Sequence, residues 1–144
     1  MVNAHIDASQ GLDGEPIVLA VFDLDEPEVT GSAHVVAAIV ADRFRNAEMA
    51  ADDVLELREL TALREDLGAL THHPGMKTVV LRPARLNALR DAIMSFVTGR
   101  DEAEWMRDED REPLAAVRVL LWPLEDLCAD AMRAALAPPA PRPL

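Results

Sequence analysis

The most regular hydrophobic pattern in the chain is a nearly unbroken apolar run over residues 16–24, PIVLAVFDL. It is rich in β-branched residues and is bounded by prolines. Such a run favours a strand buried on both faces, because a half-exposed strand would alternate with polar residues. Residues 25–32 are acidic and turn-rich, which predicts a loop with helix caps available at Thr30 and Ser32.

The next pattern has the spacing of a helix and covers residues 33–50. Its apolar positions are Val36, Ile39, Val40, Phe44 and Ala47. Apolar residues that recur at three- and four-residue intervals line one side of a helix, so an amphipathic helix is predicted.

An internal similarity links residues 54–70 to residues 80–96, which align without gaps at an offset of 26. Each unit could be a short strand that leads into a helix. The second unit is clearer, because KTVVLR is β-rich and Pro83 suits the first position of a helix. That helix is predicted to end at Gly99. The first unit stays open, since residues 52–71 could equally form one helix.

The last third of the chain changes character twice. Residues 100–113 are highly charged and predict a short helix or loop that Trp105 anchors to the body. Residues 112–136 carry a helical stripe of apolar side chains, and Pro123 should kink or split this helix. Residues 138–144 are rich in proline and predict an extended tail.

Together these elements predict a small α/β or α+β protein. About three strands would be covered by helices, with a long, kinked helix at the C-terminal end. A mostly α-helical bundle is the alternative. A chain of 144 residues corresponds to one ordinary domain. We expect that domain over residues 16–137, with a loose arm at 1–15 and the tail at 138–144.

Composition narrows the class of partner. The net charge is −12, with 13 Arg but a single Lys, and Ala reaches 24 residues, a bias typical of a bacterium with a GC-rich genome. The acidic excess argues against nucleic acid and anionic membranes as partners, because both are bound through Lys and Arg.

The chain also has no long apolar segment and no basic leader at its start, so a cytoplasmic protein is expected. Cys128 is the only cysteine, which predicts a buried structural thiol and a reducing compartment.

Two aspartates at the end of the apolar run are the first candidates for chemistry. The stretch VFDLDE resembles motif I of the haloacid dehalogenase-like hydrolases, in which an apolar strand ends in Asp-x-Asp-Gly-Thr. The resemblance implies that Asp23 is a nucleophile and Asp25 a general acid, in a phosphoryl hydrolase that needs a divalent metal. FVTGRD is similar to the Thr-Gly-Arg of motif II in some members. Glu26 and Pro27 stand where the family has Gly-Thr, and Pro restricts the turn that Gly allows there.

A separate interpretation of the same segment is metal binding without catalysis. Carboxylate oxygens suit Mg²⁺ or Ca²⁺. The candidate ligands are Asp23, Asp25, Glu26 and Glu28. Their order differs from that of an EF-hand loop, so a solvated acidic loop is the simpler prediction.

The remaining candidates are histidines, basic residues and tryptophans. The histidines His5, His34, His72 and His73 lack the spacings of zinc-protease and di-iron helices. The THHPG stretch instead predicts a turn after a helix. The basic cluster comprises Lys77, Arg82, Arg85 and Arg90, and we expect it to pair with the protein's own carboxylates. Trp122 is predicted to pack between helices, and Trp105 is the better candidate for an interface residue.

The function predicted from these observations is that of a small, acidic, non-enzymatic bacterial protein that works through protein–protein contacts. Self-association as a homodimer is the first possibility. No catalytic, cofactor-binding or metal-binding residue is assigned. One alternative is a divalent-metal-dependent phosphoryl hydrolase that uses Asp23 and Asp25. Another is a domain that binds a small apolar ligand in a pocket between helices.

Overall fold

The computed structural model describes residues 1–45, 51–101 and 106–136. Its elements are, in order, β1 (Val2–Gln10), β2 (Pro16–Leu24), α1 (Glu26–Arg45), α2 (Ala51–Leu70), β3 (Lys77–Leu81), α3 (Pro83–Asp101), α4 (Asp108–Arg118) and α5 (Leu121–Leu136). The strands form an antiparallel sheet in the order β1-β2-β3. The predicted α+β class with three strands is therefore confirmed.

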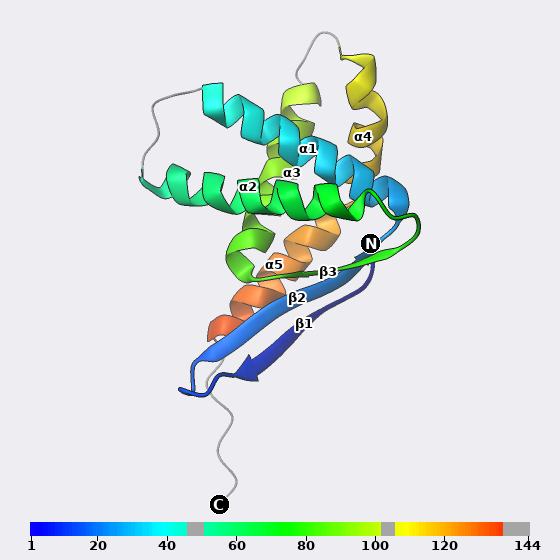
Figure 1. The fold of residues 1–144 in the computed structure, drawn as a ribbon. Helices are drawn as coiled ribbons and strands as arrows, with labels where there is room; N and C mark the ends of the chain where they lie inside the picture. The colour runs from blue at the N-terminus through cyan, green and yellow to red at the C-terminus, as the bar shows by residue number, and fades with distance from the viewer. Residues whose placement is uncertain (46–50, 102–105, 137–144) are drawn as a thin grey trace, which may run out of the picture.

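The helices gather on one side of the sheet (Figure 1). Helix α5 packs against β1 and β2, and α3 packs against β2. Helix α3 also contacts the four other helices, so it is the centre of the helical layer. None of the helices in the described ranges combines the length and apolar character that a bilayer crossing requires.

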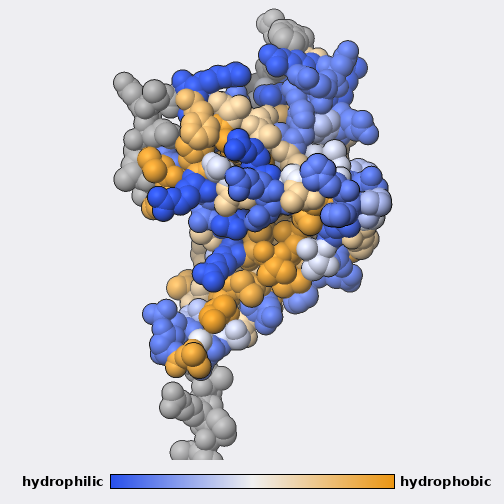
Figure 2. Space-filling view, viewed as in Figure 1, coloured by the Kyte–Doolittle hydropathy of each residue, from blue (hydrophilic) through white to orange (hydrophobic). Residues whose placement is uncertain are grey.

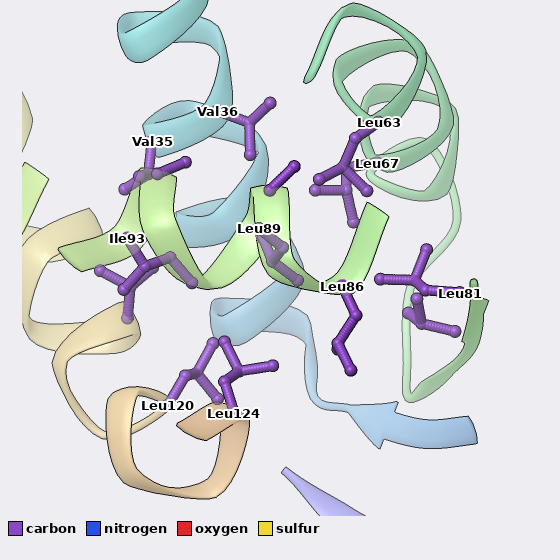
Figure 3. Packing of buried hydrophobic residues seen from close by; sticks show 14 of the residues in the cluster. Val35, Val36, Leu63, Leu67, Leu81, Leu86, Leu89, Ile93, Leu120 and Leu124 are labelled. Carbon is purple, nitrogen blue, oxygen red and sulfur yellow. The ribbon is translucent and has the colours of Figure 1, made fainter. Parts of the chain in front are cut away.

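The hydrophobic core surrounds α3 (Figure 3). Its side chains meet leucines and valines from α1, α2, α5 and β3. The labelled core residues are Val35, Val36, Leu63, Leu67, Leu81, Leu86, Leu89, Ile93, Leu120 and Leu124. Each such side chain stabilises the fold by about 1.5–3 kcal/mol when it is fully buried. The core is aliphatic, and Phe22 and Phe96 are its buried aromatic residues in the described ranges.

Strand β2 forms where the apolar run predicted it, but the prediction that both of its faces are buried is wrong. Alternate residues from Val18 to Leu24 face the helices and are buried. Ile17, Leu19 and Val21 face the other way and are only half-buried or exposed. The reason is that the helices cover one face of the sheet, so the second set of apolar side chains has no layer above it.

The loose arm predicted over residues 1–15 is also wrong. Residues 2–10 form β1, which pairs with β2 along its length apart from a bulge between Val2 and His5. The hydrophobic pattern could not indicate this strand, because all its side chains but that of Ile6 are exposed. Backbone hydrogen bonds to β2 define the strand, and Gly14 adopts a φ of 81° in the turn between them.

The loop predicted over residues 25–32 is instead the start of α1, and the caps predicted at Thr30 and Ser32 are wrong. Asp25 caps the helix. Its Oδ1 accepts a hydrogen bond from the Glu28 backbone N–H, and Glu28 Oε1 accepts one from the Asp25 N–H, both at 2.9 Å. This reciprocal pair is a capping box, which satisfies two N–H groups that the first turn leaves open. The buried Glu28 carboxylate also pairs with the amino group of Met1.

The remaining elements settle the open alternatives. Residues 51–70 form the single helix α2, and the second unit is a strand followed by a helix that begins at Pro83, as predicted. Helix α3 continues past Gly99, so the predicted end there is wrong. The interruption expected near Pro123 separates α4 from α5, and this proline lies in the first turn of α5, where its missing N–H is tolerated. The predicted C-terminal tail, residues 138–144, lies outside the described residues.

Helices α1 and α4 cross closely at Gly31. A Cβ atom added to Gly31 would lie 3.0 Å from the Ala116 Cβ and 3.3 Å from the Pro113 carbonyl oxygen. We expect Gly31→Val to lower the free energy of unfolding by about 1–3 kcal/mol, because it overpacks this crossing. Gly68→Val is the matched control, since a Cβ there would meet nothing within 4 Å. Chemical denaturation should show little change for the control, and equal effects of the two substitutions would contradict the close crossing.

Candidate functional site

The structure separates the two aspartates of the VFDLDE stretch. Asp23 lies near the end of β2 on the face away from the helices, where its carboxylate accepts hydrogen bonds from Thr78 Oγ1 at 2.6 Å and Asn3 Nδ2 at 2.9 Å. The bond from Thr78, followed by that from Asn3, lowers the pKa of Asp23 below its usual value. Asp25 instead caps α1. The two carboxylates thus have separate structural partners and do not form one site.

The acidic residues that follow them do not gather around a common point either. Glu28 is buried at the helix cap, whereas Glu26 is exposed. Within the ranges that the structure describes, no group of three or more His, Cys, Asp or Glu side chains could hold a metal ion.

Glu26 lines a groove between α1 and α4, with a volume of about 460 Å³. Its other lining residues are Pro27, Thr30, Gly31, Asp108, Glu109, Glu112 and Pro113. The four carboxylates give this groove a negative potential, which disfavours phosphate and other anions.

A cluster that sequence reasoning missed lies beside this groove. Asp110 of α4 is buried, and its two carboxylate oxygens face different partners. The Oδ1 atom lies 2.8 Å from His34 Nε2 of α1, and Oδ2 accepts a hydrogen bond of 3.1 Å from Arg100 Nε of α3. The guanidinium of Arg100 also lies over the Phe96 ring, 4.3 Å from its centre, and the His34 ring meets the same ring edge-on. One carboxylate therefore connects three helices.

Burial by itself raises the pKa of Asp110, but the hydrogen bonds from His34 and Arg100 and the charge of Arg100 outweigh it. The resulting pKa lies below the usual value, so the carboxylate is ionised at neutral pH. Ser32, two residues before His34, has a buried hydroxyl with no hydrogen-bond partner in the described part of the chain. It therefore makes no hydrogen bond to His34, and the cluster consists of an ion pair with aromatic packing.

The other candidates from the sequence occupy ordinary structural positions. Arg85 pairs with Glu59 at 2.9 Å, and Arg90 pairs with Asp91 at 3.0 Å, as predicted for the basic cluster. Two further members of the cluster, one lysine and one arginine, depart from this pattern. Lys77 Nζ donates a hydrogen bond to the Pro74 carbonyl, and Arg82 is exposed beyond β3. His72 and His73 lie in the predicted turn after α2.

The tryptophan and cysteine predictions have different outcomes. Trp122 is 79 % exposed at the start of α5, so the prediction that it packs between helices is wrong. The apolar stripe of that helix turns Leu124 and Cys128 inward and leaves Trp122 outside. Cys128 is buried, as predicted, and this burial raises the pKa of its thiol. Trp105 lies outside the described residues.

The most distinctive surface is the face of the sheet opposite the helices, which we call the open sheet face. Along its centre lie Ile17, Leu19 and Val21, the outward apolar residues of β2. Val80 of β3 pairs with Val21, is 53 % exposed and belongs to the same face, as does Val2 of β1. Figure 2 shows apolar side chains gathered over the strands, with polar side chains around them. Contiguous apolar surface of this kind is typical of sites that contact another molecule.

The residues of this face were visible in the sequence, but their exposure was not. The run in β2 is apolar on both sides, so its letters alone do not show which side is covered. The register with β1 and β3 supplies that information.

No protein-family model, no curated protein and no solved structure matches this chain.

Proposed function

We propose that this protein works through protein–protein contact and that the open sheet face is its contact surface. The observation that carries the proposal is the exposure of apolar side chains on the outward face of β2 and β3. Ile17 is 41 % exposed and Val80 53 % exposed, although the inward side chains that alternate with them on β2 and β3, from Val18 to Leu24 and at Val79 and Leu81, are buried against the helices. A sheet with one solvated face normally alternates apolar and polar residues, and β2 does not.

The surrounding charges support the same surface. The chain carries a net charge of −12, yet Asp23 is the only charged residue among the outward side chains of β2 and β3. That carboxylate already accepts hydrogen bonds from Thr78 and Asn3. A partner that covers β2 and β3 would therefore remove few other polar groups from water. An apolar centre with a polar rim is the usual anatomy of a protein interface.

Placing a charge on this face should weaken the contact and leave the fold intact. We expect Val80→Lys to weaken self-association, or the binding of a companion protein from native extract, at least tenfold, because a lysine would have to be desolvated there. Sedimentation velocity over a range of concentrations and co-purification measure the two forms of contact. Val54→Lys is the matched control, because Val54 is 46 % exposed on α2, away from the sheet. Equal behaviour of the two variants, or no contact of either kind for the wild type, would contradict the proposal.

A further inference from the structure

The two borders of the open sheet face carry opposite charges at the same level. Asp7 of β1 pairs with Leu19 of β2. On the other side Leu81 pairs with Ala20, so Arg82, the next residue along the chain, lies beside Leu19. Asp7, Leu19 and Arg82 therefore form one row across the sheet.

Arg82 continues the outward alternation of β3. It precedes Pro83, which keeps the residue before it extended, and its carbonyl accepts the first hydrogen bond of α3. The side chains of Asp7 and Arg82 are exposed. In the described part of the chain neither makes a hydrogen bond or an ion pair, whereas Arg85 and Arg90 nearby are both paired. The row thus has an unpaired negative end and an unpaired positive end.

We propose that the open sheet face binds a second copy of this chain, with the two sheets stacked about a two-fold axis that runs parallel to the strands. This inference rests on the proposed function and names the partner. Rotation about such an axis keeps every row at its own level and exchanges the two borders. Leu19 then faces Leu19 of the second copy, and Asp7 faces Arg82 of the second copy, twice in each dimer.

The charges distinguish this arrangement from the other face-to-face one. A two-fold axis across the strands would place β1 over β1 and β3 over β3. With that axis at the level of Leu19, Asp7 would meet Asp7 and Arg82 would meet Arg82, and like charges in contact are unfavourable. With the axis at the level of Ala20, Asp7 would meet His5 of the second copy, but Arg82 would meet Val80 and stay unpaired. With the axis at the level of Val21, Asp7 would meet Val2 and Arg82 would meet Thr78, so neither charge would face an opposite charge. Only the axis parallel to the strands pairs both Asp7 and Arg82 with an opposite charge and also brings the apolar side chains of the two β2 strands together.

The size of the face predicts a weak dimer. Nine residues of β2 span about 30 Å, and three strands span about 14 Å with their side chains. Each copy therefore buries about 400–600 Å², which is below or at the lower limit for stable protein interfaces. We expect a dissociation constant in the micromolar range or above, so the measurement must extend to concentrations of several hundred micromolar.

A charge exchange tests the arrangement. The variants D7R and R82D each place two like-charge pairs in the dimer, and we expect each to weaken self-association at least tenfold. Asp is a favoured residue at the helix cap that Arg82 occupies, so R82D should fold normally. An equimolar mixture of the two variants should associate as tightly as the wild type, because each arginine at position 7 then meets an aspartate at position 82. D42R and R45D, which exchange an exposed pair on α1, are matched controls that should associate like the wild type.

The outcomes are distinct from those that test the contact surface itself. Sedimentation equilibrium of the single variants and of their mixture gives the dissociation constants. A mixture that stays as weak as either variant, or single variants that associate like the wild type, would overturn this arrangement. If the wild type is monomeric at every concentration but Val80→Lys still loses a companion protein, the open sheet face remains the contact surface and the second copy is excluded as its partner.

Discussion

Replacing Phe96 by alanine is expected to lower the free energy of unfolding by about 4 kcal/mol. The ring is fully buried in α3, at the centre of the helical layer. Truncation removes its apolar surface and leaves a cavity that the surrounding aliphatic side chains cannot fill without shifting. It also removes the surface on which the Arg100 guanidinium lies, at 4.3 Å from the ring centre. Because typical domains are stable by about 5–15 kcal/mol, this loss should be visible as a large shift of the unfolding midpoint.

Two further variants separate the contribution of Phe96 from that of its helix. Met94→Ala truncates a neighbouring, exposed side chain of α3 and should change the unfolding free energy by less than about 0.5 kcal/mol. Phe96→Leu keeps most of the volume and should lose less than about 2 kcal/mol. Urea denaturation followed by circular dichroism measures all three. If Phe96→Ala is no more destabilising than Met94→Ala, the ring is not at the centre of the core.

The sequence predicted the elements whose signal is local. The β2 run, the strand before Pro83 and the helical spacing of α1 all depend on residues that are neighbours in the chain. The sequence predicts a start of α1 that is too late, because Pro27 belongs to a segment with the composition of a turn. A proline is tolerated in the first turn of a helix, where the N–H that it lacks would be free anyway.

The elements that the sequence did not predict depend on tertiary partners. β1 has almost no buried side chain, so no hydrophobic pattern marks it, and only its pairing with β2 defines it. The His34–Asp110 contact joins two helices that are far apart in the chain, and neither residue belongs to a recognisable motif. The sequence predicts that Trp122 packs between helices because large apolar residues are usually buried, but the rotation of α5 leaves its side chain outside.

The sequence alone does not locate the contact surface that we propose. The absence of other patterns favours protein contact as a hypothesis, and only the sheet register shows which apolar side chains are exposed. Asp7 and Arg82 are distant in sequence and come into one row because β2 lies between their strands. The same register also explains why Asp23 and Asp25, two residues apart, have unrelated partners: one ends a strand and the other begins a helix.

Replacing Asp110 by alanine is expected to lower the free energy of unfolding by about 2–3 kcal/mol. Removal of this buried carboxylate leaves the cation of Arg100 and the Nε2 atom of His34 without their partner. Both side chains are about one-third exposed and can reach water in part, which keeps the loss below that of a fully buried pair. Asp108→Ala is the control, because Asp108 lies in the same first turn of α4 and favours the helix dipole equally, but is exposed. It should lose less than about 1 kcal/mol.

Asp110→Asn should make the free energy of unfolding depend less on pH in the acidic range. The pKa of Asp110 is lower in the folded protein than the value of about 3.9 in an unfolded chain, so ionisation of this carboxylate stabilises the folded state. That stabilisation is complete above about pH 5 and is lost as the pH falls through the folded-state pKa, because protonation then removes the charge that Arg100 and His34 bind. The difference in unfolding free energy between wild type and Asp110→Asn should therefore shrink as the pH falls below about pH 4. Urea denaturation at a series of pH values measures this difference, with Asp108→Asn as the control for the general effect of acid. A difference that stays unchanged down to pH 3 would show that the carboxylate is not held in its charged form by these two partners.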